Sequence, residues 1–597
     1  MYLRTVFFLL MGVLALFSGR ASAIEYMSVD EIQRGMKGIG RTVFQGTRID
    51  TFHVEILGVL RNVFGPKSDM ILARLSGGPL AETGIIAGMS GSPVYIDGKL
   101  IGAVGWGWSF TQVPIAGITP IGEMMAMLDR KSEAPDTVSS FYRQKSFRTV
   151  QVPDLGMGVG ELRPVAVPLM MSGFAPQVLA KYREDLLGLG LLPVQAGGGM
   201  DPSLPVGPFE PGASVGVQLL RGDFNLTTIG TLTHRIGDRI LGFGHPNLWW
   251  GRTALPMTAA YIHEIVPNQI NSFKLGVGSR PMGVIVQDRA PGIAGVVGTK
   301  AKMMPARIEV HSADQDVTFE MEVFRNRELT PLLMRMAVAS SLISAEKLVG
   351  ETTVRGRVRI KLKGYDLLEI EDVYAGPRGL GLAVLGLTQP FAQLMQNPFQ
   401  EVQVEEVAFQ LDVEDDVWAA DIRGIQLKKS SFEAGDTVDV MVRLKPHMAK
   451  EETVEARLVI PDRFQKGRLM LRATNGKTHR AQEIKRAPGV YTPQDLDGLV
   501  RLLGKRVRND DLVLELVASM PSVTVEDREM TALPVSVLSA LKQSRASGVV
   551  QEVRQTVLDQ DIHRTNYMLS GSQTVLLSVG DGTGLIFTGK ASSQEKR

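Results

Sequence analysis

The sequence of 597 residues contains no cysteine. This absence excludes a disulfide framework, a thiol nucleophile and a thiolate metal site. Long apolar runs are also missing beyond the N-terminal segment, since no later stretch reaches the roughly 18 apolar residues that span a membrane. The charges nearly cancel, with 65 basic and 63 acidic residues, and aromatic residues make up only 6%. Because no basic stripe is interleaved with aromatic residues, we expect no nucleic-acid partner.

The first 23 residues have the pattern of a secretory signal. Arg4 provides the positive end, Val6–Phe17 is the apolar stretch, and Ala21-Ser22-Ala23 is an A-x-A cleavage site. We therefore expect cleavage after Ala23 and a mature protein in the periplasm or outside the cell, without a stable transmembrane anchor. An uncleaved signal that serves as an anchor is the alternative.

The composition predicts a mainly β, multidomain protein, because 63 glycines and 31 prolines accompany frequent Val, Ile and Thr runs. Hydrophobic residues make up 44% of the chain, enough for several cores. The strand, turn and helix patterns divide the chain as follows: 1–23 signal peptide, 24–130 first β-rich part, 131–210 linker and helical excursion, 211–310 second β-rich part, 311–415 α+β region, 416–525 β-sandwich module, and 526–597 C-terminal strands and tail.

The most informative motif is Gly88 to Pro93, which reads G-M-S-G-S-P. Glycines on both sides of Ser90 allow the tight turn that a nucleophilic serine needs, and the backbone amides of Gly88, Met89 and Ser90 are candidates for an oxyanion hole. The motif runs into V-Y-I-D-G-K-L-I-G-A-V, in which Asp97-Gly98 predicts a two-residue hairpin between alternating apolar strands. A Gly/Ser-rich turn without chemistry is the alternative reading of the hexapeptide.

The stretch from Thr83 to Val104 resembles the serine segment of the SpoIVB-type peptidases, which belong to the trypsin-like clan. A second stretch, Gly230–Pro246, reads G-T-L-T-H-R-I-G-D-R-I-L-G-F-G-H-P and is similar to the segment that carries the catalytic histidine in that family. The resemblance implies a trypsin-like double β-barrel, with Ser90 as nucleophile and His245 as general base. Residues 24–130 and 211–310 would then be the serine-bearing and histidine-bearing halves of the double barrel.

The chain departs from the family pattern in two respects. In the family the histidine precedes the serine, whereas here Ser90 comes 155 residues before His245. The two halves would therefore be in swapped order, which is acceptable because a catalytic triad is defined by geometry. Ser76 stands where the family has its aspartate, so the group that orients the imidazole stays open among Ser76, Asp69, Asp238, Asp288 and a backbone carbonyl.

The strands after the serine hairpin line the substrate cleft in the trypsin-like clan. The candidates for this wall here are Trp106, Trp108, Gly117 and Thr119. A Ser–His mechanism needs neither a cofactor nor a metal ion, and we expect none.

The predicted function is that of an exported serine endopeptidase, which cleaves protein or peptide substrates in the bacterial cell envelope. The alternative is a catalytically inactive envelope scaffold with a peptidase-like fold. In both cases the C-terminal β-sandwich could contact other envelope proteins.

Overall fold

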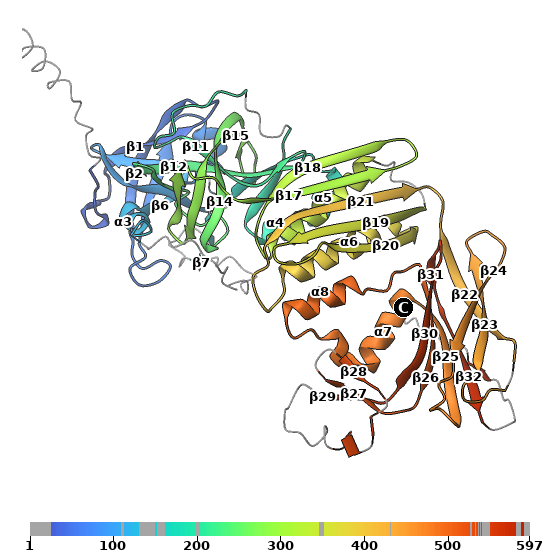
Figure 1. The fold of residues 1–597 in the computed structure, drawn as a ribbon. Coiled ribbons are helices and arrows are strands. Elements are labelled where there is room, and N and C mark those ends of the chain that lie inside the picture. The colour runs from blue at the N-terminus through green and yellow to red at the C-terminus, as the bar shows by residue number, and fades with distance from the viewer. Residues whose placement is uncertain are drawn as a thin grey trace, which may run out of the picture.

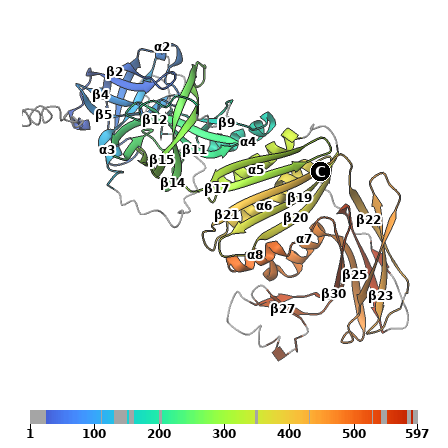
Figure 2. The same ribbon diagram turned by 45° about the horizontal axis from the view of Figure 1, so that its top comes forward.

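The computed structural model describes residues 25–589, except 109–110, 112, 130–149, 152–160, 198–202, 346–350, 430, 526–527, 532, 535, 538, 540–549 and 581–586. The predicted signal peptide and its cleavage site lie outside the described residues. Figure 1 shows two β-barrels at one end of the molecule, a sheet covered by helices in the middle, and a β-sandwich at the other end. The same order is visible in the rotated view of Figure 2.

The first barrel contains the predicted serine hairpin. Its strands are β1 (Lys37–Val43), β2 (Ile49–Leu60), β3 (Met70–Ser76), β4 (Pro93–Ile96), β5 (Lys99–Trp108) and β6 (Ile115–Pro120), with the short helices η1 (Val29–Glu31), α2 (Leu80–Thr83) and α3 (Ile121–Met125). They pair in the order β4-β1-β2-β3-β6-β5, and the pairing of β4 with β5 closes the barrel. Asp97 and Gly98 join these two strands with φ values of 49° and 79°, as the hairpin signal predicts.

The segment between the barrels contributes strands to both of them. It contains β7 (Val150–Gln151), β8 (Glu161–Pro164), β9 (Val167–Ser172), α4 (Pro176–Gly188) and β10 (Leu191–Gln195). Strand β8 pairs with β5 of the first barrel, and β9 pairs with β12 of the second. Residues 131–210 were expected to be a linker with a helix. The structure contains the helix and, in addition, these strands. The strands were not predicted because their apolar runs are short and uneven.

The second barrel closes in the same way as the first. Its strands are β11 (Ser214–Gly222), β12 (Asn225–Ile236), β13 (Arg239–Gly242), β14 (Gly251–Val266), β15 (Phe273–Arg289) and β16 (Gly292–Val297). They pair in the order β12-β13-β16-β15-β14-β11, and β11 pairs with β12 to complete the ring. The predicted fold class is confirmed: the protein is mainly β, and its N-terminal half carries a trypsin-like pair of barrels.

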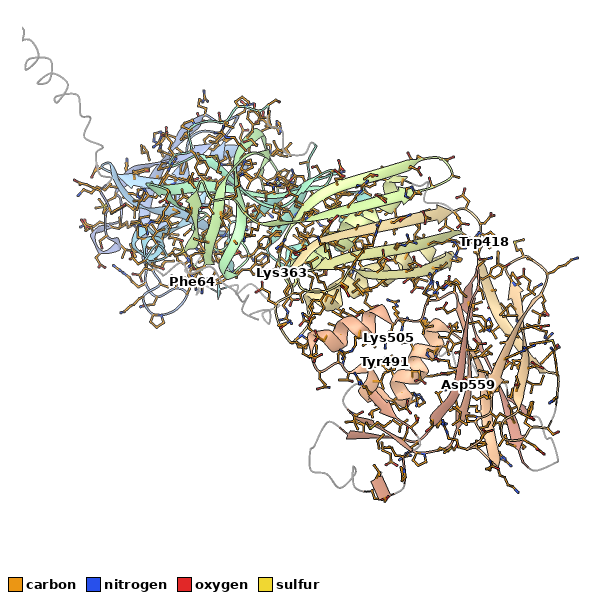
Figure 3. The ribbon with its side chains drawn as sticks, viewed as in Figure 1. Phe64, Lys363, Trp418, Tyr491, Lys505 and Asp559 are labelled. Carbon is orange, nitrogen blue, oxygen red and sulfur yellow. The ribbon has the colours of Figure 1, made fainter. Side chains whose placement is uncertain are left out.

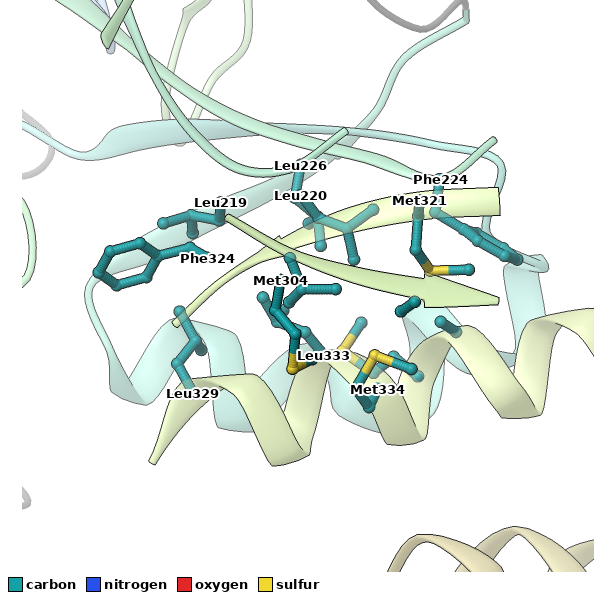
Figure 4. Close-up of a cluster of buried hydrophobic side chains, with 14 of the residues drawn as sticks. Leu219, Leu220, Phe224, Leu226, Met304, Met321, Phe324, Leu329, Leu333 and Met334 are labelled. Carbon is teal, nitrogen blue, oxygen red and sulfur yellow. The ribbon is translucent and has the colours of Figure 1, made fainter. Parts of the chain in front are cut away.

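The sheet of the second barrel continues into the α+β region, because β11 also pairs with β18. This region contains β17 (Met303–His311), β18 (Asp316–Phe324), α5 (Leu329–Ala345), β19 (Thr352–Leu362), β20 (Leu368–Gly376), α6 (Gly379–Met395) and β21 (Val404–Glu414). Helices α5 and α6 pack on one face of the sheet. Figure 4 shows the core between α5 and the sheet, where Leu333 and Met334 of the helix point toward Met304 and Met321 of the strands.

The C-terminal β-sandwich consists of two sheets. The first has the order β24-β23-β22-β31 and the second β30-β26-β25-β32-β33. Their strands are β22 (Ala419–Leu427), β23 (Thr437–Pro446), β24 (Glu452–Val459), β25 (Gly467–Asn475), β26 (Asp511–Ala518), β30 (Thr556–Arg564), β31 (Met568–Ser570), β32 (Ser572–Val579) and β33 (Phe587–Gly589). The sandwich thus extends beyond the expected boundary at residue 525, because β30 and β32 pair with β26 and β25.

Helices and a small sheet are inserted into the sandwich. They are α7 (Gly476–Arg486), η2 (Pro488–Tyr491), α8 (Leu496–Gly504), β27 (Ser522–Val525), β28 (Arg528–Met530) and β29 (Val550–Val553). Trp418, labelled in Figure 3, marks the passage from the α+β region into the sandwich, where its ring lies 5.8 Å from that of Tyr567. Among the described residues, no helix combines the length and the apolar character needed to cross a membrane.

Candidate active site

Ser90 lies in a tight turn between α2 and β4, and its side chain is fully buried. Gly88 and Gly91 on either side have φ values of 96° and 92°, which favour glycine. At Gly91 the approach of the second barrel adds a steric reason, because a Cβ atom there would lie 2.0 Å from the carbonyl oxygen of Thr231. The glycines of the motif therefore serve both the turn and the contact between the barrels.

Strand β12 of the second barrel holds the serine turn through its threonines. The backbone N–H of Thr231 donates to the carbonyl oxygen of Ser90 at 2.8 Å, and its hydroxyl donates to the carbonyl oxygen of Gly88 at 3.1 Å. The hydroxyl of Thr233 donates to the carbonyl oxygen of Gly91 at 2.7 Å. The serine turn is thus a fixed part of the seam between the barrels.

His245 follows β13 and reaches the same seam from the second barrel. A Cβ atom at Gly105 of β5 would lie 2.3 Å from the carbonyl oxygen of Gly244. The backbone of β5 is therefore in direct contact with the backbone of the histidine segment. The hydroxyl of Thr119 donates to that same carbonyl at 2.5 Å. Since the N–H of Gly91 donates to the carbonyl oxygen of Val104 at 2.7 Å, neighbouring residues of β5 hold the serine turn and the histidine segment.

The imidazole of His245 is oriented by a backbone carbonyl. Its Nδ1 lies 2.7 Å from the carbonyl oxygen of Pro246, which can only accept, so Nδ1 carries the proton and the neutral ring has a free lone pair on Nε2. The ring is fully buried, and burial lowers the pKa of His245 to about 4. Among the residues that the structure describes, neither Nε2 nor the hydroxyl of Ser90 has a hydrogen-bond partner, so the two groups do not bond to each other in this state.

The serine turn leaves two backbone amides able to stabilise an oxyanion. Of the three predicted donors, the N–H of Met89 is bonded to the carbonyl oxygen of Ile86 at 3.0 Å. Within the described part of the chain, the N–H groups of Gly88 and Ser90 have no acceptor. The geometry therefore favours Gly88 and Ser90 over Met89 for this role.

Asp288 holds the loop that follows His245. Its buried carboxylate accepts the N–H groups of Asn247 and Leu248 at 2.8 and 2.7 Å, and that of Trp250 at 3.4 Å. Burial raises the pKa of Asp288 to about 6 even though these donors favour its charged form. Asp288 therefore acts on the backbone beside His245 and does not bond to the imidazole.

The other three candidates for the orienting group lie elsewhere. Asp69 accepts from Arg61 and from the N–H of Asn62 at 2.7 and 3.0 Å. Asp238 is exposed in the turn between β12 and β13, and Ser76 is exposed at the end of β3. None of them bonds to His245, whereas the backbone carbonyl, which the sequence left open, does.

Two of the four predicted cleft residues lie beside His245. The rings of Trp106 and His245 have centroids 6.5 Å apart, and the indole N–H of Trp106 donates to the hydroxyl of Thr119 at 3.1 Å. Gly117 lies behind Trp106, because a Cβ atom there would be 2.9 Å from its Cβ. Trp108 is half-buried further along β5.

His245 also lines a cavity of about 340 Å³. The wall of this cavity comes from the second barrel and from the segment between the two barrels, namely Arg163–Val167, Leu187, Gly190–Leu192, His245–Asn247 and Asn271. The histidine is thus next to open space although its ring is covered.

Lys274 of β15 is a buried residue of the site that sequence reasoning missed. Its Nζ donates to the hydroxyls of Thr42 and Thr231 at 2.8 and 3.4 Å, and its stem would lie 3.3 Å from a Cβ at Gly88. Burial lowers the pKa of Lys274 to about 7. The alternation in N-S-F-K-L-G-V-G places Lys274 on the face opposite Phe273 and Leu275, where a lysine is expected to face solvent, so this pattern did not indicate its burial.

Comparison with known proteins supports the peptidase character of the first barrel. No curated protein and no solved structure matches the chain. No group of three or more His, Asp or Glu side chains suited to a metal ion occurs in the part of the chain that the structure describes. Residues 17–125 match the family model described as SpoIVB peptidase S55, and Ser90 lies within the match. On this match, the N-terminal part of the chain carries a SpoIVB-type peptidase domain.

Proposed function

We propose that the protein is an exported serine endopeptidase, in which Ser90 is the nucleophile and His245 the general base. The observation that carries the proposal is the seam between two closed barrels, where adjacent residues of β5 hold the turn of Ser90 and the backbone beside His245. The match of residues 17–125 to the SpoIVB peptidase S55 family supports the serine peptidase class and a protein substrate. The swapped order of the two segments is part of this proposal.

The geometry supports the following reaction. As the hydroxyl of Ser90 attacks a peptide carbonyl, its proton passes to Nε2 of His245, and the amides of Gly88 and Ser90 bind the negative oxygen. The protonated imidazole then gives its proton to the leaving amine, and an ester to Ser90 remains. Water, deprotonated by Nε2, hydrolyses this ester and restores the serine.

The Pro246 carbonyl takes the place of the usual aspartate in this scheme. A neutral carbonyl keeps Nδ1 protonated and fixes the ring, but it stabilises the imidazolium less than a carboxylate does. Asp288 supports the arrangement indirectly, since it binds the amides of the residues that follow Pro246. We expect slow, selective turnover from such a site.

A specific observation favours the alternative of an inactive scaffold. Ser90 and His245 are both fully buried, and their reactive atoms have no hydrogen-bond partner in the described part of the chain. Catalysis therefore requires a shift that brings Nε2 to the hydroxyl and opens a path for substrate. A scaffold would need neither change.

Labelling with a fluorophosphonate separates the two functions. In this reaction the oxygen of Ser90 bonds to phosphorus, fluoride leaves, and the hydroxyl proton passes to Nε2. Labelling that persists in Ser76→Ala and disappears in Ser90→Ala and His245→Ala supports the peptidase. Ser76 is the matched control, because it is an exposed serine on the same barrel. Detectable labelling of the Ser90→Ala variant at the level of the wild type would contradict the proposal.

We further propose that the N-terminal signal directs the protein to the periplasm or the cell exterior. Fractionation of cells that express the full chain, with N-terminal sequencing of the mature protein, tests this point. A protein that begins at Ile24 in the periplasmic or extracellular fraction is the expected result. A cytoplasmic protein that begins at Met1 would contradict it.

A further inference from the structure

The end of β5 that extends beyond β4 pairs with β8, a strand from outside the six-stranded ring of the first barrel. Strand β8 lies antiparallel on β5, with Leu162 opposite Trp108, Arg163 opposite Gly107 and Pro164 opposite Trp106. The pairing continues past the strand, because the N–H of Val165 donates to the carbonyl oxygen of Gly105 at 2.9 Å. This arrangement is that of an extended peptide added to a sheet edge.

The added segment leads directly to the catalytic seam. Gly105, which accepts from Val165, is also the residue whose backbone touches the carbonyl of Gly244. Val165 and Ala166 line the same cavity as His245 and Pro246. The residues on both sides of the Val165–Ala166 peptide bond therefore border the same cavity as the proposed general base.

The single proline of the segment fits this manner of binding. In an antiparallel ladder, residue pairs that exchange hydrogen bonds alternate with pairs that do not. Since Val165 bonds to Gly105, the intervening Pro164 faces Trp106 at a position where no N–H is required.

Leu162 fills an apolar site at the far end of the segment. It is fully buried and clusters with Met70 and Trp106, against which Phe64 and Trp108 also pack. The ring of Phe64, labelled in Figure 3, lies 4.2 Å from that of Trp106. Removal of β8 would expose this cluster, so the barrel carries an apolar site that needs an occupant.

We propose that residues 162–166 occupy the substrate cleft of the peptidase, and that this cleft takes extended peptides with a large aliphatic residue at the Leu162 position and a small aliphatic residue at the Val165 position. The proposal rests on the proposed function, because it assigns the substrate class and the inhibition of that same site. An occupant within the same chain is present at high effective concentration, so free peptide competes poorly with it. The chain as described is thus closed to substrate by its own β8 segment.

Peptide binding tests this inference without catalysis. We would measure by fluorescence anisotropy the binding of a labelled Glu-Leu-Arg-Pro-Val-Ala-Val peptide to Ser90→Ala protein, with and without Leu162→Asp. We expect Leu162→Asp to weaken β8 and to lower the Kd for the peptide about tenfold or more, equivalent to about 1.4 kcal/mol. A peptide in which Asp replaces the leucine should not bind. Leu569→Asp, a buried leucine of the distant sandwich, is the matched control and should leave the Kd unchanged.

A second variant keeps the test informative if the buried aspartate of Leu162→Asp causes misfolding. Val165→Pro removes the N–H that bonds to Gly105 and keeps an apolar side chain, so we expect it to increase peptide binding as well. Equal peptide binding by the parent and both variants would overturn the inference. Binding gained in the variants, without fluorophosphonate labelling of their Ser90-containing forms, would contradict the proposed function and leave the inference standing.

Discussion

The backbone N–H of Thr231 donates to the carbonyl oxygen of Ser90 across the seam between the barrels, at 2.8 Å. The side chain of Thr231 adds two links, because its hydroxyl donates to the carbonyl of Gly88 and accepts from Nζ of Lys274. A single threonine thus connects the nucleophile, the oxyanion turn and a buried lysine.

Replacement of Thr231 by valine removes the hydroxyl and keeps the shape and the backbone bond. We expect a loss of about 1–3 kcal/mol in the free energy of unfolding, since both Gly88 and Lys274 lose a partner. Fluorophosphonate labelling should slow as well. Thr228→Val is the control, because Thr228 lies on the same strand and bonds instead to the carbonyl of Val217. Equal labelling rates for the two variants would argue against a role of Thr231 in the turn.

Gly91→Ala should destabilise the protein much more than Gly98→Ala. Both glycines have a positive φ, but a Cβ at Gly91 meets the carbonyl oxygen of Thr231 at 2.0 Å. At Gly98, no atom of the described residues other than the two adjacent ones lies within 4 Å of such a Cβ. An alanine at Gly98 lowers the free energy of unfolding by about 1–2 kcal/mol because of its positive φ. At Gly91 the steric clash adds to this conformational cost. Thermal unfolding of the two variants would compare these costs. Similar Tm values would mean that the barrels separate easily at this contact.

Lys274→Met should reduce the dependence of stability on pH above neutrality. The pKa of Lys274 is about 7 in the folded protein and rises to its usual value on unfolding. Between these values the unfolded chain binds more protons, so the wild type gains stability as the pH rises, by up to about 1.4 kcal/mol per pH unit. Tm values measured at about pH 7 and about pH 9.5 should therefore differ by less in the variant than in the wild type. A difference of the same size in both proteins would show that Lys274 is charged when folded.

Asp288→Asn should impair the site more than it impairs the fold. The amide oxygen can accept only part of the N–H bonds that the carboxylate receives, and its NH₂ group opposes the N–H groups of Asn247 and Leu248. We expect a loose loop after His245 and labelling reduced by about tenfold or more. The Asp69→Asn variant, which affects a carboxylate bonded to Arg61, should label at the wild-type rate. Labelling of Asp288→Asn at the wild-type rate would show that Asp288 does not support the site.

The local features of the serine segment were predictable from the sequence. At the Asp97-Gly98 turn and at the glycines around Ser90, the residue types alone predict the backbone conformations. The double barrel and the choice of His245 rested on the resemblance. Composition alone does not say which distant segments meet.

The features that sequence reasoning missed depend on contacts between distant segments. Strand β8 has four residues and is defined by its partner β5, so no periodicity reveals it. The sandwich includes β30, which pairs with β26 across the inserted small sheet, and β32, which pairs with β25 across both the inserted helices and that sheet. The role of the Pro246 carbonyl was one of several open choices, because only the folded chain shows which acceptor reaches Nδ1.

The decisive measurement is to locate the fluorophosphonate adduct by mass spectrometry, in the wild type and in the Leu162→Asp and Val165→Pro variants. We predict one adduct per chain on the peptide that contains Ser90, formed faster in both variants and absent from His245→Ala. An adduct on any other residue, or no adduct in folded variants with β8 displaced, would contradict the assignment of Ser90 and His245 as a catalytic pair.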